Sequence, residues 1–199
     1  MNRYTKTKKA YKPEKLELEG ILALTKEDNL QRWAMLHLSY YAGLRSMEIS
    51  QLDFGHVYKD GKVKNTAQLI TKGGKERMIR LGSKKLISAL TTWYEVQNRS
   101  EITMNTPLFR NRQGARFNAN SVVKQFATAY KVPNEGRHES ERLSSHSGRR
   151  YFATVLGNTA GVTTKQLMAL GGWESPEVAL SYVETNEHVL DEFLGHADL

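Results

Sequence analysis

Five side chains of this sequence have the types that phosphoryl chemistry without a metal requires, and each lies near a predicted break in secondary structure. Arg45 follows a predicted helix end, and Lys72 lies in the Gly-Gly turn of a predicted hairpin. His146 and Arg149 are three residues apart, and therefore on one face of a helix. Tyr182 lies near the end of a short amphipathic run. Together these residues could attack a phosphodiester and stabilise its transition state.

Each residue type suits one part of that chemistry. The nonbridging oxygens of a pentavalent phosphorane need cationic donors with bidentate reach, which the guanidinium groups of Arg45 and Arg149 can supply. A tyrosine with an unperturbed pKa of about 10 needs a base or a cationic field to become a nucleophile, and clustered Arg, Lys and His provide both. The leaving oxygen needs a proton, which a lysine at a hairpin turn can donate.

Taken singly, these residues also have ordinary structural explanations. Arg45 and Glu48, three residues apart, are typical of an ion pair on one helical turn, and a lysine at a hairpin turn is usually solvated. Trp173 and Tyr182 lie in apolar runs, where aromatic residues usually pack in the core. The combination of two arginines, a histidine, a lysine and a tyrosine favours the catalytic interpretation.

The elements that must position these residues are mostly helical. Thr25 is predicted to cap a helix that ends at Gly43. A β-hairpin is predicted over "AQLITKGGKERMIRL", where Gly-Gly separates two strand-like runs. Further helical runs are predicted over "LRSMEISQL", "KKLISALTTWYEVQ" and "VVKQFATAY", and three more follow Ser145. The pattern predicts a mainly α domain with a small antiparallel β-sheet, an α+β fold.

The charge of the chain favours a polyanionic partner. The 199 residues carry a net charge of +8, with a pI of about 9.6, which is typical of proteins that bind nucleic acid or an acidic membrane face. Residues 1–15 contain six Lys or Arg and one Glu, so +5 of this charge lies in a basic arm with two tyrosines. Either phosphate contact or a solvated tail would explain such an arm.

Cysteine usage and hydropathy narrow the class of protein. The sequence has no cysteine, which excludes disulfides and thiolate metal sites. Its six histidines and its acidic residues show no spacing typical of metal ligands, so neither a metal nor another cofactor is expected. The apolar stretch "ILALT" is too short for a signal peptide or a membrane span. We therefore expect a soluble, cytoplasmic protein with no membrane partner.

Six positions, in this order, resemble the signature of the tyrosine recombinases, a family that includes the phage integrases. They are Arg45 in "AGLRSMEISQL", Lys72 in "TKGGKERMIRL", His146 and Arg149 in "LSSHSGRRYFAT", Trp173 in "LGGW" and Tyr182 in "ALSYVE". The nine-residue step from Trp173 to Tyr182 also matches, and the Gly-Gly-Trp form is similar to that of the Cre recombinase. The resemblance covers about residues 20–186.

The resemblance implies a site-specific DNA recombinase that cleaves and rejoins strands without metal or ATP. Tyr182 would attack the scissile phosphate, form a covalent 3′-phosphotyrosine and release a 5′-hydroxyl. Arg45 and Arg149 would hold the nonbridging oxygens. His146 would bond the phosphate and assist proton transfer.

Supporting roles follow from the same resemblance. Lys72 would protonate the leaving 5′ oxygen, with Lys75 as the alternative if the register of the turn differs. Trp173 would donate its indole N–H to the phosphate, and Glu48 would support Arg45. Arg150 stands where many relatives have a second histidine, a departure that the sequence does not explain.

The resemblance also implies domains and partners. Residues 1–20 are expected to form a basic arm, residues 21–186 the catalytic domain, and residues 187–199 a tail helix that either docks on a neighbouring protomer or folds back on its own domain. Double-stranded DNA is the expected partner, on which a homotetramer exchanges strands through a Holliday junction, with accessory DNA-bending proteins as further candidates. Relatives normally carry an N-terminal clamp domain, so the chain is either a catalytic fragment or a short stand-alone recombinase.

Two other functions stay open on the sequence alone. A type IB topoisomerase-like enzyme would share the phosphotyrosine chemistry but reseal a single duplex, and supercoil relaxation without recombinant product would favour it. A DNA-binding module that has lost catalysis is the second, although all six positions carry competent residues. The DNA sequence that is recognised does not follow from the residue types.

Overall fold

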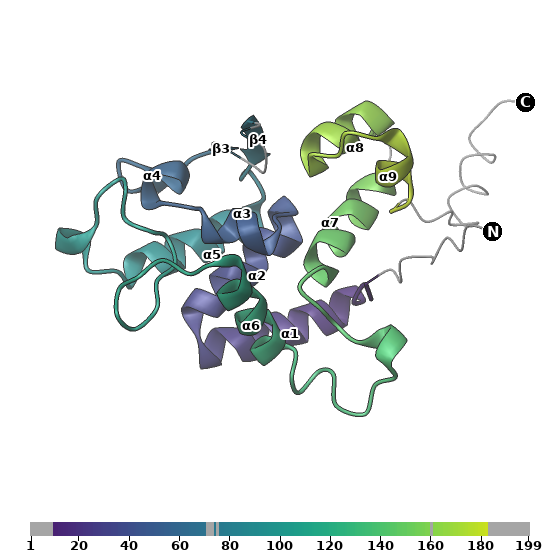
Figure 1. Ribbon diagram of the computed structural model, residues 1–199, viewed down its shortest axis with the longest axis horizontal. Helices are drawn as coiled ribbons and strands as arrows, with labels where there is room; N and C mark the ends of the chain where they lie inside the picture. Colours follow the sequence, from purple (N-terminus) through teal and green to yellow (C-terminus); the bar gives the residue numbers. More distant parts are fainter. Residues whose placement is uncertain (1–9, 71–73, 75, 160, 183–199) are drawn as a thin grey trace, which may run out of the picture. The chain divides into compact units, whose positions relative to one another are not determined.

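The computed structural model describes residues 10–70, 74, 76–159 and 161–182 (Figure 1). The chain forms two compact units, and the boundary between Phe152 and Ala153 lies within helix α7. The first unit contains α1 (Lys15–Asp28), α2 (Leu30–Ala42), α3 (Ser46–Ser50), α4 (Phe54–Val57), β1 (Tyr58–Lys59), β2 (Lys62–Val63), β3 (Thr66–Ile70), β4 (Glu76–Arg80), α5 (Lys84–Glu95), η1 (Arg99–Glu101), α6 (Ala119–Ala129), η2 (Glu139–Glu141) and the start of α7 (Ser147–Gly157). The second contains the end of α7, α8 (Thr164–Gly171) and α9 (Pro176–Leu180). Within the described ranges, none of these helices is long and apolar enough to span a bilayer.

Helix α2 lies at the centre of the first unit. Helices α1, α3, α5 and α6 all pack against it (Figure 1), and its side chains are buried on nearly every side. A helix that is buried all round is typical of a core element. The surrounding helices supply apolar side chains that include Leu18, Leu86, Val122 and Phe126.

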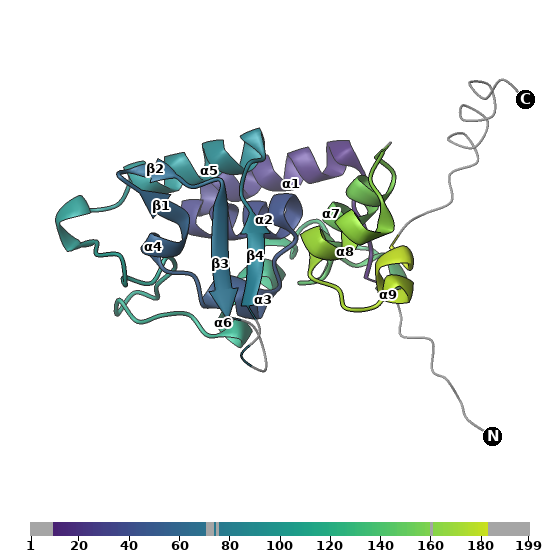
Figure 2. The same ribbon diagram turned by 90° about the horizontal axis from the view of Figure 1, so that it is seen from above.

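The predicted β-hairpin is confirmed. Strands β3 and β4 lie side by side (Figure 2) and pair in antiparallel register from Thr66 opposite Arg80 to Ile70 opposite Glu76. Alternate residues point inward, as the two-residue period of a strand requires. The short pair β1–β2, also antiparallel, was not predicted. The mainly α fold with small antiparallel sheets agrees with the prediction.

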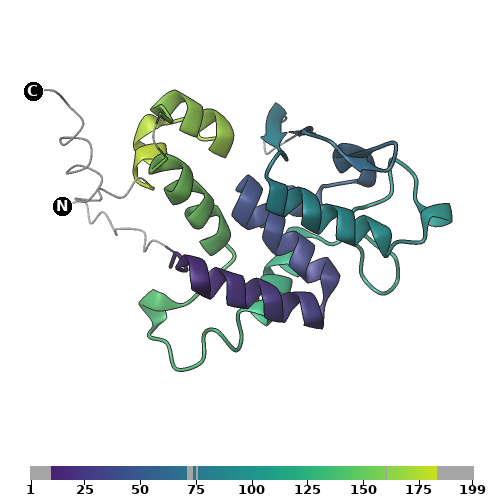
Figure 3. The ribbon, with the colours of Figure 1, turned by 180° about the vertical axis from the view of Figure 1, so that it is seen from behind.

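The helix start predicted at Thr25 is wrong. Thr25 lies in the last turn of α1, where its Oγ1 donates to the carbonyl of Ile21 at 2.7 Å. Leu18, Ile21 and Leu22 are buried at helical spacing, so α1 packs against α2 (Figure 3) and begins inside the stretch expected to be a basic arm. The residue that caps the next helix is Asn29, whose side chain accepts a backbone N–H of α2 at 2.8 Å.

The second unit has a small core of its own. Helices α8 and α9 pack together, and the helical runs predicted after Ser145 are confirmed as α7, α8 and α9. The buried members of this core are Ala153, Leu167, Trp173 and Ala179, with Leu156, Val162, Met168 and Tyr182 packed against them.

Candidate active site

Arg45 stands at the connection between α2 and α3. Gly43 ends α2 in the left-handed conformation, with φ of 64°, and a Cβ atom there would lie 2.4 Å from the ring of Phe152, so the position requires glycine. The backbone N–H of Arg45 donates to Oε2 of Glu48 at 2.7 Å, and its Nη1 donates to Oε1 at 3.3 Å. The Arg45 side chain is still 40% exposed. Its guanidinium is therefore held on one side and accessible on the other.

Glu48 is the buried centre of this arrangement. Its side chain is only 1% exposed, and besides the two bonds from Arg45 it accepts a hydrogen bond from Nη1 of Arg77 on β4. A buried carboxylate is costly unless it is paired and hydrogen-bonded, and here it has both kinds of partner. Glu48 therefore contacts Arg45 as the sequence predicted, but the sequence did not single out Arg77.

Arg149 reaches the same connection from α7. It is 3% exposed, and its Nη1 donates to the carbonyl of Gly43 at 2.7 Å. That carbonyl lies two residues before Arg45 in the chain. The two arginines predicted to bind phosphate are thus both tied to the short connection between α2 and α3.

His146 immediately precedes α7 and is exposed. Its carbonyl accepts the backbone N–H of Arg150 at 2.9 Å, which starts the helix, and its own N–H donates to Oγ of Ser144 at 3.3 Å. An imidazole at this position is solvent-accessible and sits one helical turn before Arg149 in the sequence.

Lys72 and its alternative Lys75 lie outside the described residues. The strands on either side, β3 and β4, are described and pair as predicted. The role predicted for either lysine stays a prediction.

The other two predicted site residues, Trp173 and Tyr182, lie together in the second unit. Their ring centroids are 5.1 Å apart at an interplanar angle of 32°, and Trp173 is 7% exposed. Tyr182 is half-buried, and its carbonyl accepts a hydrogen bond from Oγ1 of Thr154 at 3.1 Å. Both aromatic residues therefore contribute to the small core, as their apolar surroundings in the sequence indicated, and Tyr182 keeps part of its surface accessible.

The Gly-Gly pair before Trp173 has a steric cause. Gly172 ends α8 with φ of 64°. A Cβ atom on Gly171 would lie 1.8 Å from the ring of Trp173, so only glycine lets this ring fold back against the end of the helix. Ser175 then caps α9 and Pro176 occupies its first position, which starts the helix at a defined residue.

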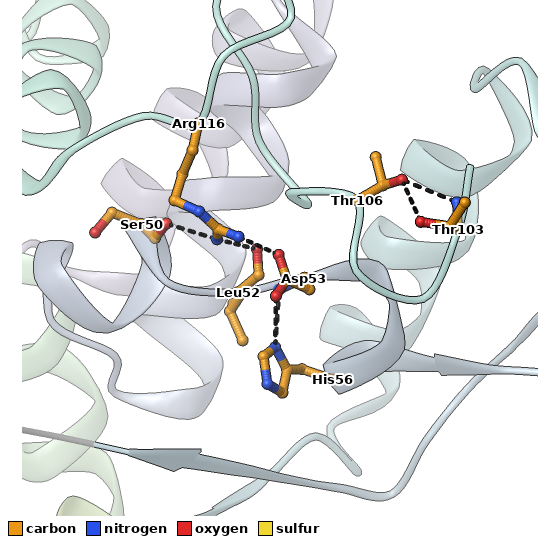
Figure 4. A network of polar contacts seen from close by, with 7 residues as sticks. All are labelled: Ser50, Leu52, Asp53, His56, Thr103, Thr106 and Arg116. Carbon is orange, nitrogen blue, oxygen red and sulfur yellow. Dashed lines mark hydrogen bonds and ion pairs between the residues drawn. The ribbon is translucent and has the colours of Figure 1, made fainter. Parts of the chain in front are cut away.

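An arginine in the loop before α6, Arg116, holds the far end of α3 (Figure 4). Its Nη1 donates to the carbonyls of Ser50 at 3.3 Å and Leu52 at 3.2 Å, and its Nη2 pairs with Oδ1 of Asp53. The backbone N–H of Asp53 donates to Nδ1 of His56 at 2.9 Å. Arg116 thus fixes the C-terminal end of this five-residue helix from a distant part of the sequence, whereas Arg45 directly precedes its N-terminal end.

The sequence carried a signal for Arg77 but none for Arg116. In "ERMIR", Arg77 shares strand parity with Ile79 and so belongs to the inward face. An inward arginine requires a buried acid, and this signal was not used. Arg116 lies in an irregular loop, where no periodicity indicates the direction of a side chain.

Comparisons with known proteins identify the family of this chain. A family model described as "Phage integrase family" matches residues 14–189. The tyrosine recombinase XerC of Actinobacillus pleuropneumoniae is 30% identical over 168 residues, which cover 77% of this chain and 53% of the relative. The chain thus spans about half the length of this relative.

Solved structures show the same fold. The crystal structure of XerA recombinase matches with a TM-score of 0.74 at 19% identity, over 94% of this chain and 65% of that one. The Tn1549 transposon integrase in complex with circular intermediate DNA matches with a TM-score of 0.70 at 18% identity, over 96% of this chain and 69% of that one. Since the family model also covers most of the sequence, the chain belongs to the phage integrase family of tyrosine recombinases.

Proposed function

We propose that this protein is a site-specific DNA recombinase that cleaves and rejoins strands through a covalent 3′-phosphotyrosine, without metal or ATP. The observation that carries the proposal is the shared anchoring of Arg45 and Arg149 at the connection between α2 and α3. Two guanidinium groups held at one short connection, one on it and one from α7, suit the two nonbridging oxygens of a phosphodiester. The names of the relatives, a tyrosine recombinase and an integrase in complex with DNA, support DNA as the substrate.

In the proposed reaction, Tyr182 is the nucleophile. Its oxygen forms a new bond to the scissile phosphorus while the bond from phosphorus to the 5′ oxygen breaks, and Arg45 and Arg149 stabilise the charge on the nonbridging oxygens. His146 assists removal of the tyrosine proton, and Lys72 gives a proton to the leaving 5′ oxygen. The phosphotyrosine ester keeps the energy of the cleaved bond, so a 5′-hydroxyl from another strand can reseal the DNA.

We propose that residues 21–186 supply this catalytic domain and that Trp173 donates its indole N–H to the phosphate. The proposed basic arm of residues 1–20 would add phosphate contacts through residues 1–15, which contain six Lys or Arg and one Glu. Strand exchange would involve a homotetramer on double-stranded DNA, with residues 187–199 as the tail between protomers or against the same domain. Accessory DNA-bending proteins are additional candidate partners.

The test uses a library of duplexes with a randomised core and a nick a few nucleotides 3′ of each cleavage position. Cleavage releases the short fragment with its 5′-hydroxyl and traps the enzyme on the DNA. We expect a covalent adduct that survives SDS and EDTA, and sequencing the trapped duplexes yields a defined substrate. Absence of any adduct from the library would contradict the proposal.

Two controls make the trap specific. Tyr182→Phe should abolish the adduct, whereas Tyr94→Phe, which removes a half-buried hydroxyl of the first unit, should leave it unchanged. Offering a second duplex end with a free 5′-hydroxyl should produce a recombinant strand. Relaxation of supercoils without such a product would instead support the topoisomerase-like alternative.

A further inference from the structure

Arg77 is a buried arginine on β4 that is not among the residues predicted to be catalytic. It shares the inward face of the strand with Ile79, and its side chain is 8% exposed. Its neighbours Glu76 and Met78 point outward and are exposed. An arginine is rarely buried unless its charge is paired, so the contact that Arg77 makes inside the protein is informative.

That contact is to the carboxylate that also holds Arg45. Nη1 of Arg77 donates to Oε1 of Glu48, and the same oxygen accepts from Nη1 of Arg45 at 3.3 Å. The second oxygen of Glu48 accepts the backbone N–H of Arg45 at 2.7 Å. One buried carboxylate therefore links the hairpin to the arginine proposed to bind the scissile phosphate.

The two arginines differ in how much freedom they have. The side chain of Arg45 is 40% exposed and that of Arg77 is 8% exposed. An exposed pair of arginine and carboxylate is weak and tolerates several geometries. A carboxylate that also accepts a hydrogen bond from a second, buried guanidinium is confined to one position. Arg77 thus determines where Oε1 of Glu48 lies, and this oxygen sets the direction of the Arg45 guanidinium.

We infer that Arg77 is a positioning residue for strand cleavage: it holds Glu48 so that Arg45 points at a nonbridging oxygen of the scissile phosphate. The inference rests on the proposed function, because it requires that Arg45 binds this phosphate. In this role Arg77 acts through Glu48 and needs no contact with the DNA. The competing explanation is a purely structural ion pair, which would affect folding but not how the reaction depends on phosphate charge.

The test compares two substrates that differ only in the charge of the scissile linkage. One is the selected nicked duplex with its natural phosphodiester. The other carries a methylphosphonate there, in which a neutral methyl group replaces one charged nonbridging oxygen. A guanidinium that stabilises this charge contributes far less to the reaction of the neutral linkage.

Five forms of the full chain are compared on both substrates. They are the wild type, Arg77→Met, Arg77→Lys, Arg45→Lys and the control Arg80→Met, which alters an exposed arginine on the same strand. Single-turnover adduct formation is measured together with DNA affinity and thermal melting. The cleavage rate of each variant is divided by the wild-type rate on the same substrate, so the different intrinsic reactivities of the two linkages cancel.

We expect Arg77→Met and Arg45→Lys to slow cleavage of the phosphodiester by about 10- to 100-fold, as for a misplaced catalytic group. The same variants should slow the methylphosphonate by less than about threefold and leave DNA affinity within about threefold, because the missing interaction is with the transition-state charge. Arg77→Lys should recover part of the loss, since it keeps a cation beside Glu48. Arg80→Met should stay within about twofold on both substrates, as exposed substitutions usually do.

Three outcomes overturn the inference. Equal slowing of both substrates by Arg77→Met would show a structural role only. An unchanged phosphodiester rate in Arg77→Met, beside an impaired Arg45→Lys, would exclude positioning by Arg77 while leaving the proposed function intact. A wild-type rate for Arg45→Lys would remove the proposed phosphate contact, and the inference falls with it. If Arg77→Met is unfolded at the assay temperature, Arg77→Lys decides the question in the same way: its slowing of the phosphodiester is compared with its slowing of the methylphosphonate.

Discussion

The two units hold their parts of the predicted site in different ways. In the first unit, Arg149 and Glu48 are 3% and 1% exposed, and the core around them draws on helices α1 to α6. In the second unit, Tyr182 packs against a small cluster, which has four buried members among the described residues. Small apolar clusters open at a lower free energy than a large core. The arginines proposed to bind phosphate are therefore anchored in a well-packed scaffold, whereas the proposed nucleophile packs, among the described residues, against a small cluster.

This contrast predicts that substitutions in the two units affect stability and strand cleavage differently. A change in the first unit should lower stability and strand cleavage together when it reaches the network of Arg45, Glu48 and Arg149. A change in the second unit should lower cleavage while the main unfolding transition stays nearly in place.

The largest effect is expected for Arg149→Lys. Arg149 donates to the carbonyl of Gly43, and in the proposed reaction the same guanidinium also binds a phosphate oxygen. A lysine cannot reproduce this fork, so single-turnover cleavage should fall by about 10²- to 10³-fold. The control is Arg150→Lys, which changes the adjacent residue on another face of α7 and should keep cleavage within about threefold. Equal losses in the two variants would contradict the assignment of Arg149.

Acid should destabilise the first unit through His37. Burial, with smaller contributions from the charges of Lys85 and Lys26, lowers the pKa of His37 to about 4. The unfolded chain binds this proton with a pKa of about 6.5, so the stability from His37 is complete above pH 6.5 and is lost as the pH falls toward 4, by up to about 3 kcal/mol. Urea unfolding over this range measures the loss. His37→Asn should remove this part of the pH dependence, and an unchanged slope in the variant would refute the origin in His37.

In the second unit, Gly171→Ala should displace the ring of Trp173. The added Cβ would lie 1.8 Å from that ring, and such overpacking costs about 1–3 kcal/mol locally. We expect cleavage to fall about tenfold through the neighbouring Tyr182, since misplacement of a reacting group is costly, with little change in the main melting transition. Gly82→Ala is the control, because no atom lies within 4 Å of its Cβ position and its φ is not in the left-handed region. A large drop in the main transition would argue against separate support of the two units.

The smallest effect compares two glycines of the first unit at positive φ. Gly43 has φ of 64° and Gly114 has φ of 79°, so alanine at either position is strained. Only the Cβ at Gly43 meets another side chain, the ring of Phe152 at 2.4 Å, since that at Gly114 meets nothing within 4 Å. Gly43→Ala should therefore lower the free energy of unfolding by about 1 kcal/mol more than Gly114→Ala. Equal losses of unfolding free energy in the two variants, measured by chemical denaturation, would show that the ring of Phe152 moves aside without cost.

Local patterns predicted much of the fold. The Gly-Gly hairpin and the helical runs after Ser145 followed from turn residues and periodicity, and the structure confirms them. The start of the first helix could not be predicted in this way, because its apolar residues adjoin a strongly basic stretch and Thr25 has the side chain of a typical helix cap. In the structure, the stripe that includes Leu18 and Ile21 is buried, so tertiary packing rather than the capping signal sets the beginning of α1.

The candidate site divides in the same way. Arg45 with Glu48, and Trp173 with Tyr182, are close in sequence, and the structure places each pair in contact. The contacts that fix α3 join residues far apart in the sequence: Arg77 follows Glu48 by 29 residues, and Arg116 follows Asp53 by 63 residues. A single sequence carries no signal for such pairings beyond strand parity.

The most direct test of the central claim is to map the trapped residue. The adduct with the selected nicked duplex is digested with protease and nuclease, and the modified peptide is sequenced by mass spectrometry. We predict one nucleotide joined through its 3′-phosphate to the hydroxyl of Tyr182 in the second unit, with no adduct in Tyr182→Phe. A phosphotyrosine at another residue, or an adduct that persists in Tyr182→Phe, would contradict it.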